Sequence, residues 1–321
     1  MRRVLAAAVS AALAVTALLA TPVAAGTAHT WHVQVGAGGV TNGAFDGRSG
    51  NAFYPGRIAA HPGDTVVFTL TSPHTVTFNR PANTPLPALF PPAGGTTLNA
   101  KGQFVNSGFD PAHFFPGITF TLTLGNSLPP GRYAYICALH LFMHGVIDVV
   151  PADAALPKTD ADIAAAASRQ IARDLESASD AAERALDRAE DRPLTVFVGA
   201  GTRRVTNLRF FPASITVHVG QSITFRKTMD PTEPHTVTFG TAPANDFAPA
   251  GGPPFTWDGT HPISTGAMLT QRQFDFYIAS ALGVPGAMTT ATIKFTKAGT
   301  FKYICAIHDE AGMVASVTVL P

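Results

Sequence analysis

Two cysteines, each followed closely by a histidine and a methionine, are the residues of this 321-residue sequence best suited to chemistry. A further histidine precedes each cysteine in a Pro-His-Thr-Val-Thr-Phe segment. The two sets are His74, Cys137, His140 and Met143, and His235, Cys305, His308 and Met313. A thiolate, two imidazoles and a weak fourth ligand suit both oxidation states of copper. The sequence therefore predicts two type 1 copper sites, each holding one ion as Cu(I) or Cu(II).

These ligand sets belong to an internal repeat. Residues 131–140 match residues 299–308, and residues 73–78 match residues 234–239. A single buried Cys or His is usually a structural residue. The same four residue types in the same order in two diverged copies favour a metal-binding role instead.

Two other uses of the cysteines are less consistent with the sequence. A disulfide between Cys137 and Cys305 would require both cores to open, because each cysteine has the same interior loop position in its own copy. A structural zinc site prefers four firm ligands, and a thioether sulfur is a poor one.

The elements that must position these residues are short strands. Segments such as residues 63–70 and 220–225 alternate apolar and polar residues, with Gly or Pro at the turns. We expect seven or eight strands in each copy, arranged as a two-sheet β-sandwich. The predicted fold is all-β, with domains at residues 26–152 and 193–321.

Residues 153–192 are predicted to be a helical linker. From Thr159 to Arg192 the composition changes to Ala, Arg, Asp and Glu, and apolar residues recur at helical spacing. This narrow apolar stripe consists of Ile163, Ala167, Ile171, Leu175, Ala182 and Leu186. A solvated spacer is one interpretation, a helical hairpin with a second cap near Ser177 is another, and a small dimerisation face is a third.

The amino terminus predicts export. Arg2 and Arg3 precede an apolar run at residues 4–20, which is typical of a signal peptide over residues 1–25. A retained membrane anchor is the alternative, although the run is short for a bilayer span. The expected location is extracellular, cell-envelope or periplasmic. Without Arg2 and Arg3, 20 of the 22 basic residues remain against 21 acidic ones, so nothing in the charge favours nucleic-acid binding.

At these motifs the chain resembles the cupredoxins, the blue-copper family. The Cys137 loop has the short spacing of amicyanin, and the Cys305 loop has the longer spacing of plastocyanin. The resemblance implies Greek-key sandwiches and makes Met143 and Met313 the axial ligands. Thr75 and Thr236 stand where plastocyanin-like proteins commonly have Asn.

The predicted function is transfer of single electrons between redox partners, without enzymatic turnover. The resemblance implies docking at exposed edges around His140 and His308, one apolar with Leu141 and Phe142, the other acidic. Copper sequestration or delivery is an alternative. A copper oxidoreductase of the nitrite reductase or small laccase kind is disfavoured, because no His adjoins either cysteine and no His-x-His occurs.

Overall fold

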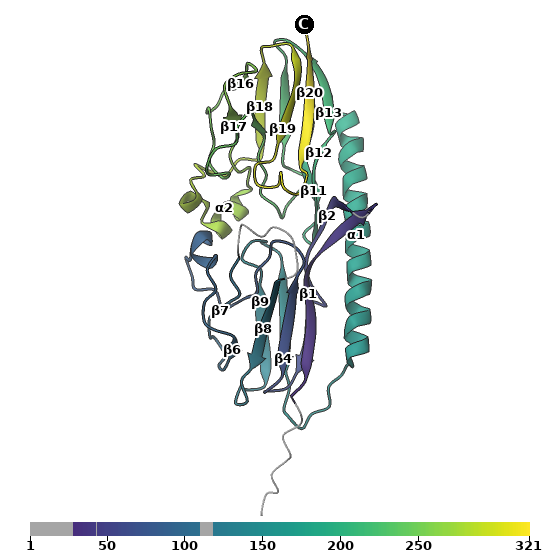
Figure 1. Ribbon diagram of the computed structural model, residues 1–321, viewed down its shortest axis with the longest axis vertical. Helices are drawn as coiled ribbons and strands as arrows, with labels where there is room; N and C mark the ends of the chain where they lie inside the picture. Colours follow the sequence, from purple (N-terminus) through teal and green to yellow (C-terminus); the bar gives the residue numbers. More distant parts are fainter. Residues whose placement is uncertain (1–27, 43, 110–117) are drawn as a thin grey trace, which may run out of the picture.

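The structure, a computed structural model, describes residues 28–42, 44–109 and 118–321. The predicted signal peptide lies outside the described residues. Figure 1 shows two β-structured halves stacked along the long axis, with one long helix beside both. We call residues before this helix the first half and residues after it the second half. Within the described chain, no helix has the length and apolar character needed to cross a bilayer.

The first half consists of strands with one 3₁₀ turn. Its strands are β1 (Thr30–Thr41), β2 (Ala44–Tyr54), β3 (Arg57–Ala60), β4 (Thr65–Leu70), β5 (Thr77–Phe78), β6 (Thr97–Leu98), β7 (Val105–Asn106), β8 (Ile118–Leu124), β9 (Gly131–Ile136) and β10 (His144–Val149). The turn is η1 (Leu86–Leu89). Buried and partly exposed side chains alternate along β4, as the sequence pattern requires for a strand with one face in the core.

The second half repeats this arrangement after α1 (Asp160–Glu190). Its strands are β11 (Thr195–Gly201), β12 (Val205–Phe211), β13 (Ser214–His218), β14 (Ser222–Arg226), β15 (Thr238–Phe239), β16 (Phe255–Trp257), β17 (Ile263–Ser264), β18 (Thr290–Phe295), β19 (Gly299–Ile304) and β20 (Val314–Leu320). It also contains α2 (Gln271–Tyr277) and η2 (Ala279–Leu282).

One sheet runs through both halves. Its strand order is β16-β18-β14-β11-β12-β2-β1-β4-β8-β6, and β12 pairs antiparallel with β2 at the middle. Each half adds its own five-stranded sheet, β3-β10-β9-β5-β7 in the first and β13-β20-β19-β15-β17 in the second. The described chain is therefore mostly β, built as two sandwiches with one layer in common.

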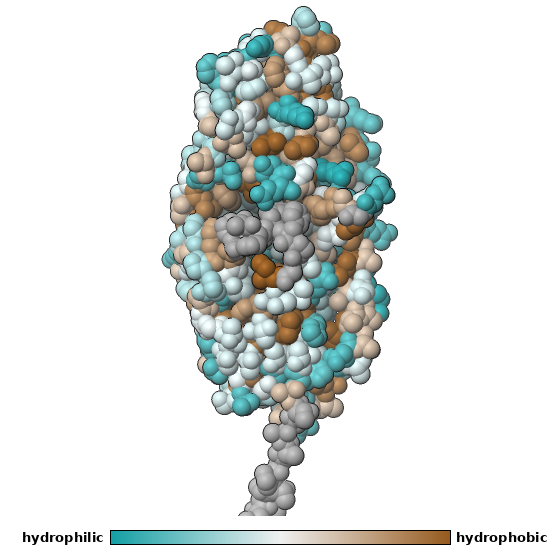
Figure 2. All heavy atoms as spheres, viewed as in Figure 1, coloured by the Kyte–Doolittle hydropathy of each residue, from teal (hydrophilic) through white to brown (hydrophobic). Residues whose placement is uncertain are grey.

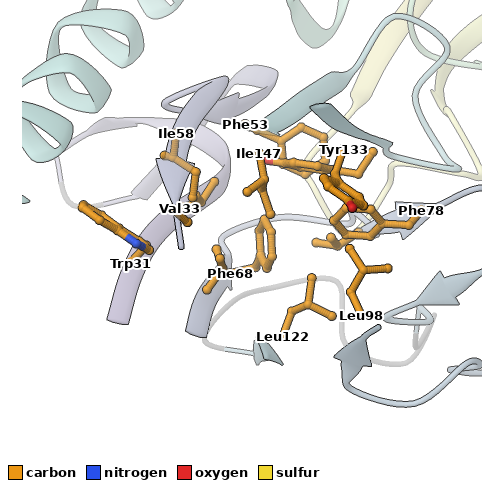
Figure 3. Close-up of a cluster of buried hydrophobic side chains, with 14 of the residues drawn as sticks. Trp31, Val33, Phe53, Ile58, Phe68, Phe78, Leu98, Leu122, Tyr133 and Ile147 are labelled. Atoms are coloured by element: carbon orange, nitrogen blue, oxygen red, sulfur yellow. The ribbon is translucent and has the colours of Figure 1, made fainter. Parts of the chain in front are cut away.

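An aromatic cluster stabilises the core of each half just ahead of its cysteine. In the first half Tyr135 contacts Phe53, Phe68 and Phe78, with ring centroids 4.6 to 5.3 Å apart. Figure 3 shows these phenylalanines among the buried side chains of this core. In the second half Tyr303 has the same place, 4.8 to 5.5 Å from three phenylalanine rings. Each tyrosine lies two residues before a cysteine, so this packing fixes the strand that carries the sulfur.

Helix α1 is continuous and packs on the shared sheet, so the interpretations as a solvated spacer and as a hairpin are wrong. It begins with a capping box between Thr159 and Asp162. In its second part the buried alanines are Ala178, Ala181 and Ala185, whereas Leu186 of the predicted stripe is 44% exposed. These small residues let the helix approach the strands closely, a packing role that the spacing of larger apolar residues did not indicate.

Candidate metal centres

The structure brings His74, Cys137 and His140 together in the first half. His74 lies three residues before β5, and Cys137 and His140 lie in the loop between β9 and β10. The sulfur of Cys137 lies 3.7 Å from Nδ1 of His74 and 3.3 Å from Nδ1 of His140, and the two nitrogens are 2.8 Å apart. All three residues are buried.

The second half contains the equivalent group of His235, Cys305 and His308. Here Sγ of Cys305 lies 3.8 Å from Nδ1 of His235 and 3.4 Å from Nδ1 of His308. The candidate ligand atoms of this buried group lie within 4.8 Å of one another, as they do in the first group. Both cysteines are free thiols.

The donor atoms fit a copper ion in each group. A metal ion roughly 2 Å from each of three ligands separates those ligands by about 3 to 4 Å, and the sulfur–nitrogen distances of both groups fall in this range. One thiolate with two imidazoles is the trigonal set of blue-copper sites. When bound, copper supplies a centre that gains and loses one electron.

The electrostatics of both groups favour thiolates. Burial on its own raises the pKa of the Cys137 thiol, but the His140 ring and backbone N–H groups lower it more, so the net pKa lies below its usual value. For Cys305, burial is likewise outweighed by His308 and His235, and the pKa falls to about 5. The thiolate is the form of cysteine that binds metals.

Thr75 and Thr236 join the two segments that carry the ligands. The backbone N–H of Thr75 donates to the Cys137 sulfur at 3.3 Å, and its hydroxyl accepts a hydrogen bond from the N–H of Ala138 at 2.7 Å. Thr236 makes the same two contacts with Cys305 and the N–H of Ala306. Each threonine, at the position where plastocyanin-like proteins commonly have Asn, therefore links the segment of the first histidine to the cysteine loop.

Met143 and Met313 close the two loops. Both side chains are buried, 2% and 0% exposed. Their carbonyl oxygens accept hydrogen bonds from the backbone N–H groups of Cys137 and Cys305, at 3.0 Å in each case. The methionines thus lie at the end of the loop that begins with the cysteine, while their role as axial ligands stays a prediction.

Asp230 makes the two groups unequal, and sequence reasoning missed it. It is fully buried, and its carboxylate lies 3.0 Å from Nε2 of His235. Burial lowers the pKa of His235, but the hydrogen bond to Asp230 raises it, with a net value of about 9. In the first half Nε2 of His74 has no hydrogen-bond partner among the described residues. Burial, and then the neighbouring His140, keep the pKa of His74 well below its usual value.

His140 and His308 are buried, so the prediction of exposed docking edges at these residues is wrong. Their exposed fractions are 7% and 6%. The apolar neighbours Leu139 and Ile307 pack against one hydrophobic cluster that draws residues from both halves. The hydroxyl of Tyr277, in α2, donates to the carbonyl of Leu139 across the junction at 2.8 Å. The loop residues next to the two histidines thus meet at the junction between the halves.

Charged residues of the second half also contact Phe142 of the predicted apolar edge. The guanidinium groups of Arg203 and Arg272 lie 5.1 and 4.8 Å from the centroid of the Phe142 ring. Such cation–π contacts help to hold the two halves together.

Glu233 lies between the two groups, and its side chain is 6% exposed. One carboxylate oxygen, Oε1, is 2.9 Å from Nε2 of His140, and the other, Oε2, is 3.7 Å from Nε2 of His308. Asn51 of β2 donates to Oε1 at 2.6 Å. Burial raises the pKa of Glu233, but His140 and then His308 bring the net value below the usual one. A single carboxylate of the second half therefore contacts a histidine of each group.

A cavity of about 580 Å³ adjoins this junction. Its wall includes His74, His140, Glu233 and His308 together with apolar residues from both halves. Ser72, whose buried hydroxyl lacks a partner among the described residues, also lines it.

The chain is similar to several known proteins. A family model described as copper binding proteins, plastocyanin/azurin family, matches residues 200–320. Plastocyanin of Sambucus nigra is 30% identical over 113 residues, which make up 35% of this chain and 89% of that protein. Solved structures with similarity include pseudoazurin from Methylobacterium extorquens AM1, at 25% identity over 39% of this chain and 73% of that chain, with a TM-score of 0.24. Plastocyanin from Dryopteris crassirhizoma matches at 24% identity over 39% of this chain and 98% of that chain, with a TM-score of 0.21.

The sandwiches and their His/Cys/His groups define a cupredoxin-like protein. The chain belongs to the plastocyanin/azurin family of copper-binding proteins.

Proposed function

We propose that the protein is an exported blue-copper protein with two cupredoxin domains, residues 26–152 and 193–321, joined by the helical segment 153–192. Each domain binds one type 1 copper ion and passes single electrons. The ligands are His74, Cys137, His140 and Met143 in the first domain, and His235, Cys305, His308 and Met313 in the second. The observation that carries the proposal is the presence of two buried thiols, each with two imidazole nitrogens within 4.8 Å.

The rigid surroundings of the ligands support electron transfer. Backbone hydrogen bonds close both cysteine loops, and the threonines after the first histidines tie these loops to the neighbouring segments. A site whose ligands are held before the metal arrives changes little when the charge of the metal changes. The energy needed to rearrange the site during electron transfer is therefore small.

Copper sequestration is the second candidate, and one observation favours it. Because His140 and His308 are buried, neither ring offers an exposed edge to an external redox protein. Figure 2 shows hydrophobic side chains interspersed with hydrophilic ones over the face that it draws. Reversible oxidation and reduction of the bound copper by small redox mediators supports electron transfer, and copper that binds without cycling supports sequestration.

The proposal contains no catalytic step. Copper oxidoreductases built from similar domains need further copper ligands, including a histidine directly beside the cysteine. The neighbours of Cys137 are Ile136 and Ala138, and those of Cys305 are Ile304 and Ala306.

The visible spectrum of the copper-loaded mature protein tests the proposal. We expect two coppers per chain and an intense thiolate-to-copper absorption band. Cys137→Ser and Cys305→Ser should each remove one copper and about half of this band, because each sulfur serves one site. Ser168→Ala, on the exposed side of α1, is the control and should leave the band intact. Loss of the whole band in either single variant, or no band in the wild type, contradicts two independent sites.

A further inference from the structure

The two candidate metal centres are joined by a continuous series of polar contacts inside the molecule. It runs from Cys137 through His140, Glu233 and His308 to Cys305. The successive contacts measure 3.3, 2.9, 3.7 and 3.4 Å. The 3.7 Å contact is an ion-pair distance and longer than a hydrogen bond.

The carboxylate of Glu233 is held in place from both halves. In the second half its backbone N–H donates to Asp230 at 3.1 Å. In the first half Asn51, which is 2% exposed, donates to Oε1. Asn51 lies in β2, the strand that pairs with β12 where the two sandwiches join. The position of Glu233 is thus determined by the same junction that unites the halves.

The histidine rings on both sides of Glu233 are buried. With the His140 and His308 rings enclosed, the Nε2 atoms that lie farthest from the sulfurs point at Glu233 instead of at solvent. Interactions between buried groups such as these are much less screened than those on an open surface. The histidine edges expected to meet external proteins therefore meet each other through one carboxylate.

We propose that Glu233 connects the two centres, so that an electron passes between the halves of one molecule through His140, Glu233 and His308. The inference rests on the proposed function. In it, the redox partner of each centre is the other centre of the same chain. One centre is oxidised by one electron and the other is reduced by one electron. No bond forms or breaks, and no proton is required.

The test uses full-length, copper-loaded protein and its Glu233→Ala variant. A pulse of methyl viologen radical supplies less than one electron per molecule, and redistribution of that electron is followed by absorption and by electron paramagnetic resonance of rapidly frozen samples. Spectra of Cys137→Ser and Cys305→Ser identify the signal of each half. In the wild type we expect a first-order process with a rate that is independent of protein concentration. In Glu233→Ala we expect this rate to fall at least tenfold.

Two further variants make the result specific. Glu233→Gln keeps the shape of the side chain and should retain a faster transfer than Glu233→Ala. Glu310→Ala removes an exposed carboxylate from the Cys305 loop and should transfer at the wild-type rate. An unchanged rate in Glu233→Ala, or a rate that rises with protein concentration, overturns the inference.

Equilibrium potentials provide a second readout. Loss of a buried negative charge disfavours the more positive oxidised state, so Glu233→Ala should raise the midpoint potentials of both centres. A rise confined to one half overturns the shared role of Glu233. Failure to bind two coppers in the wild type, in contrast, overturns the proposed function itself, so the two failures are distinguishable.

Discussion

Asp230 distinguishes two otherwise similar groups of ligands. A carboxylate that accepts a hydrogen bond from a metal-bound imidazole makes that ligand more basic and fixes its orientation. His235 has such a partner, whereas Nε2 of His74 has none among the described residues. A more basic ligand stabilises the oxidised metal, so we expect the second centre to have the lower midpoint potential.

Replacement of Asp230 with Asn tests this difference. The change keeps a side chain of the same shape but removes the negative charge beside His235. We expect the midpoint potential of the second centre to rise by about 60 mV, equivalent to a tenfold change for one electron, and that of the first centre to change little. Redox titration monitored at the blue absorption band measures both.

Asp275→Asn is the matched control, because Asp275 is an exposed carboxylate of the same half. Equal shifts in Asp230→Asn and Asp275→Asn would show that the effect is one of overall charge. No shift in Asp230→Asn would contradict the role of the hydrogen bond.

At the residue scale, the sequence predicted the donor sets because both copies carry the same residue types in the same order. Asp230 and Glu233 escaped prediction because the repeat offers no counterpart. Thr69 and Ser72 have the equivalent positions before His74. A polar residue that occurs in one copy alone carries no signal until the structure shows what it contacts.

Helix α1 is anchored to the junction by a buried polar network. Asp174, 8% exposed, accepts hydrogen bonds from the Tyr54 hydroxyl at 2.7 Å and from the Arg204 guanidinium at 2.7 and 3.1 Å. Tyr54 ends β2 and Arg204 precedes β12. The helix therefore contacts both central strands of the shared sheet through one carboxylate.

Tyr54→Phe should lower the free energy of unfolding by about 1 to 3 kcal/mol, because it leaves a buried carboxylate oxygen with one donor fewer. Urea unfolding of the metal-free protein, followed by circular dichroism, measures the change. Ser168→Ala on the exposed side of α1 should differ little from the wild type. Equal stabilities of Tyr54→Phe and the wild type would show that the network contributes nothing measurable.

At the element scale, the helix was predictable from composition and periodicity, and its observed bounds fall inside the predicted segment from Thr159 to Arg192. Its packing was not predictable. The buried side is made by small residues such as Ala178 and Ala181. Alanine occurs on all sides of this helix, so the pattern alone does not reveal which alanines meet a sheet.

The shared sheet should make the two halves unfold together. Pairing of β2 with β12, packing of α1 on both halves and the apolar cluster around Tyr277 all break when either half unfolds. Interactions of this kind couple the stabilities of neighbouring units.

The two tryptophans allow a direct test. Trp31 is buried in the first half and Trp257 in the second, and the sequence has no others. In metal-free Trp31→Phe the fluorescence reports the second half, and in Trp257→Phe it reports the first. In each variant we expect the urea midpoint by fluorescence to coincide with the midpoint by circular dichroism. Separate transitions within one variant would show that the halves unfold independently.

At the scale of the whole molecule, the burial of His140 and His308 was the main feature that sequence reasoning got wrong. Considered alone, the first loop presents an apolar edge beside His140 and the second an acidic edge beside His308. The local pattern cannot distinguish an edge that awaits an external protein from one that is covered by the other half. That distinction depends on the pairing of β2 with β12, which the sequence of neither strand indicates.

The shared sheet is symmetric about its middle. Counted outward from the β2–β12 pair, the strands are β1, β4, β8 and β6 on one side and their counterparts β11, β14, β18 and β16 on the other. This arrangement has the form of a twofold axis between β2 and β12, the symmetry of a homodimer whose subunits use identical surfaces. A chain with a single copy would form this junction only by associating with a second molecule. Fusion through α1 makes the association permanent and frees each copy to mutate separately. An acidic residue can then arise in one copy and contact histidines of both copies, as Glu233 does.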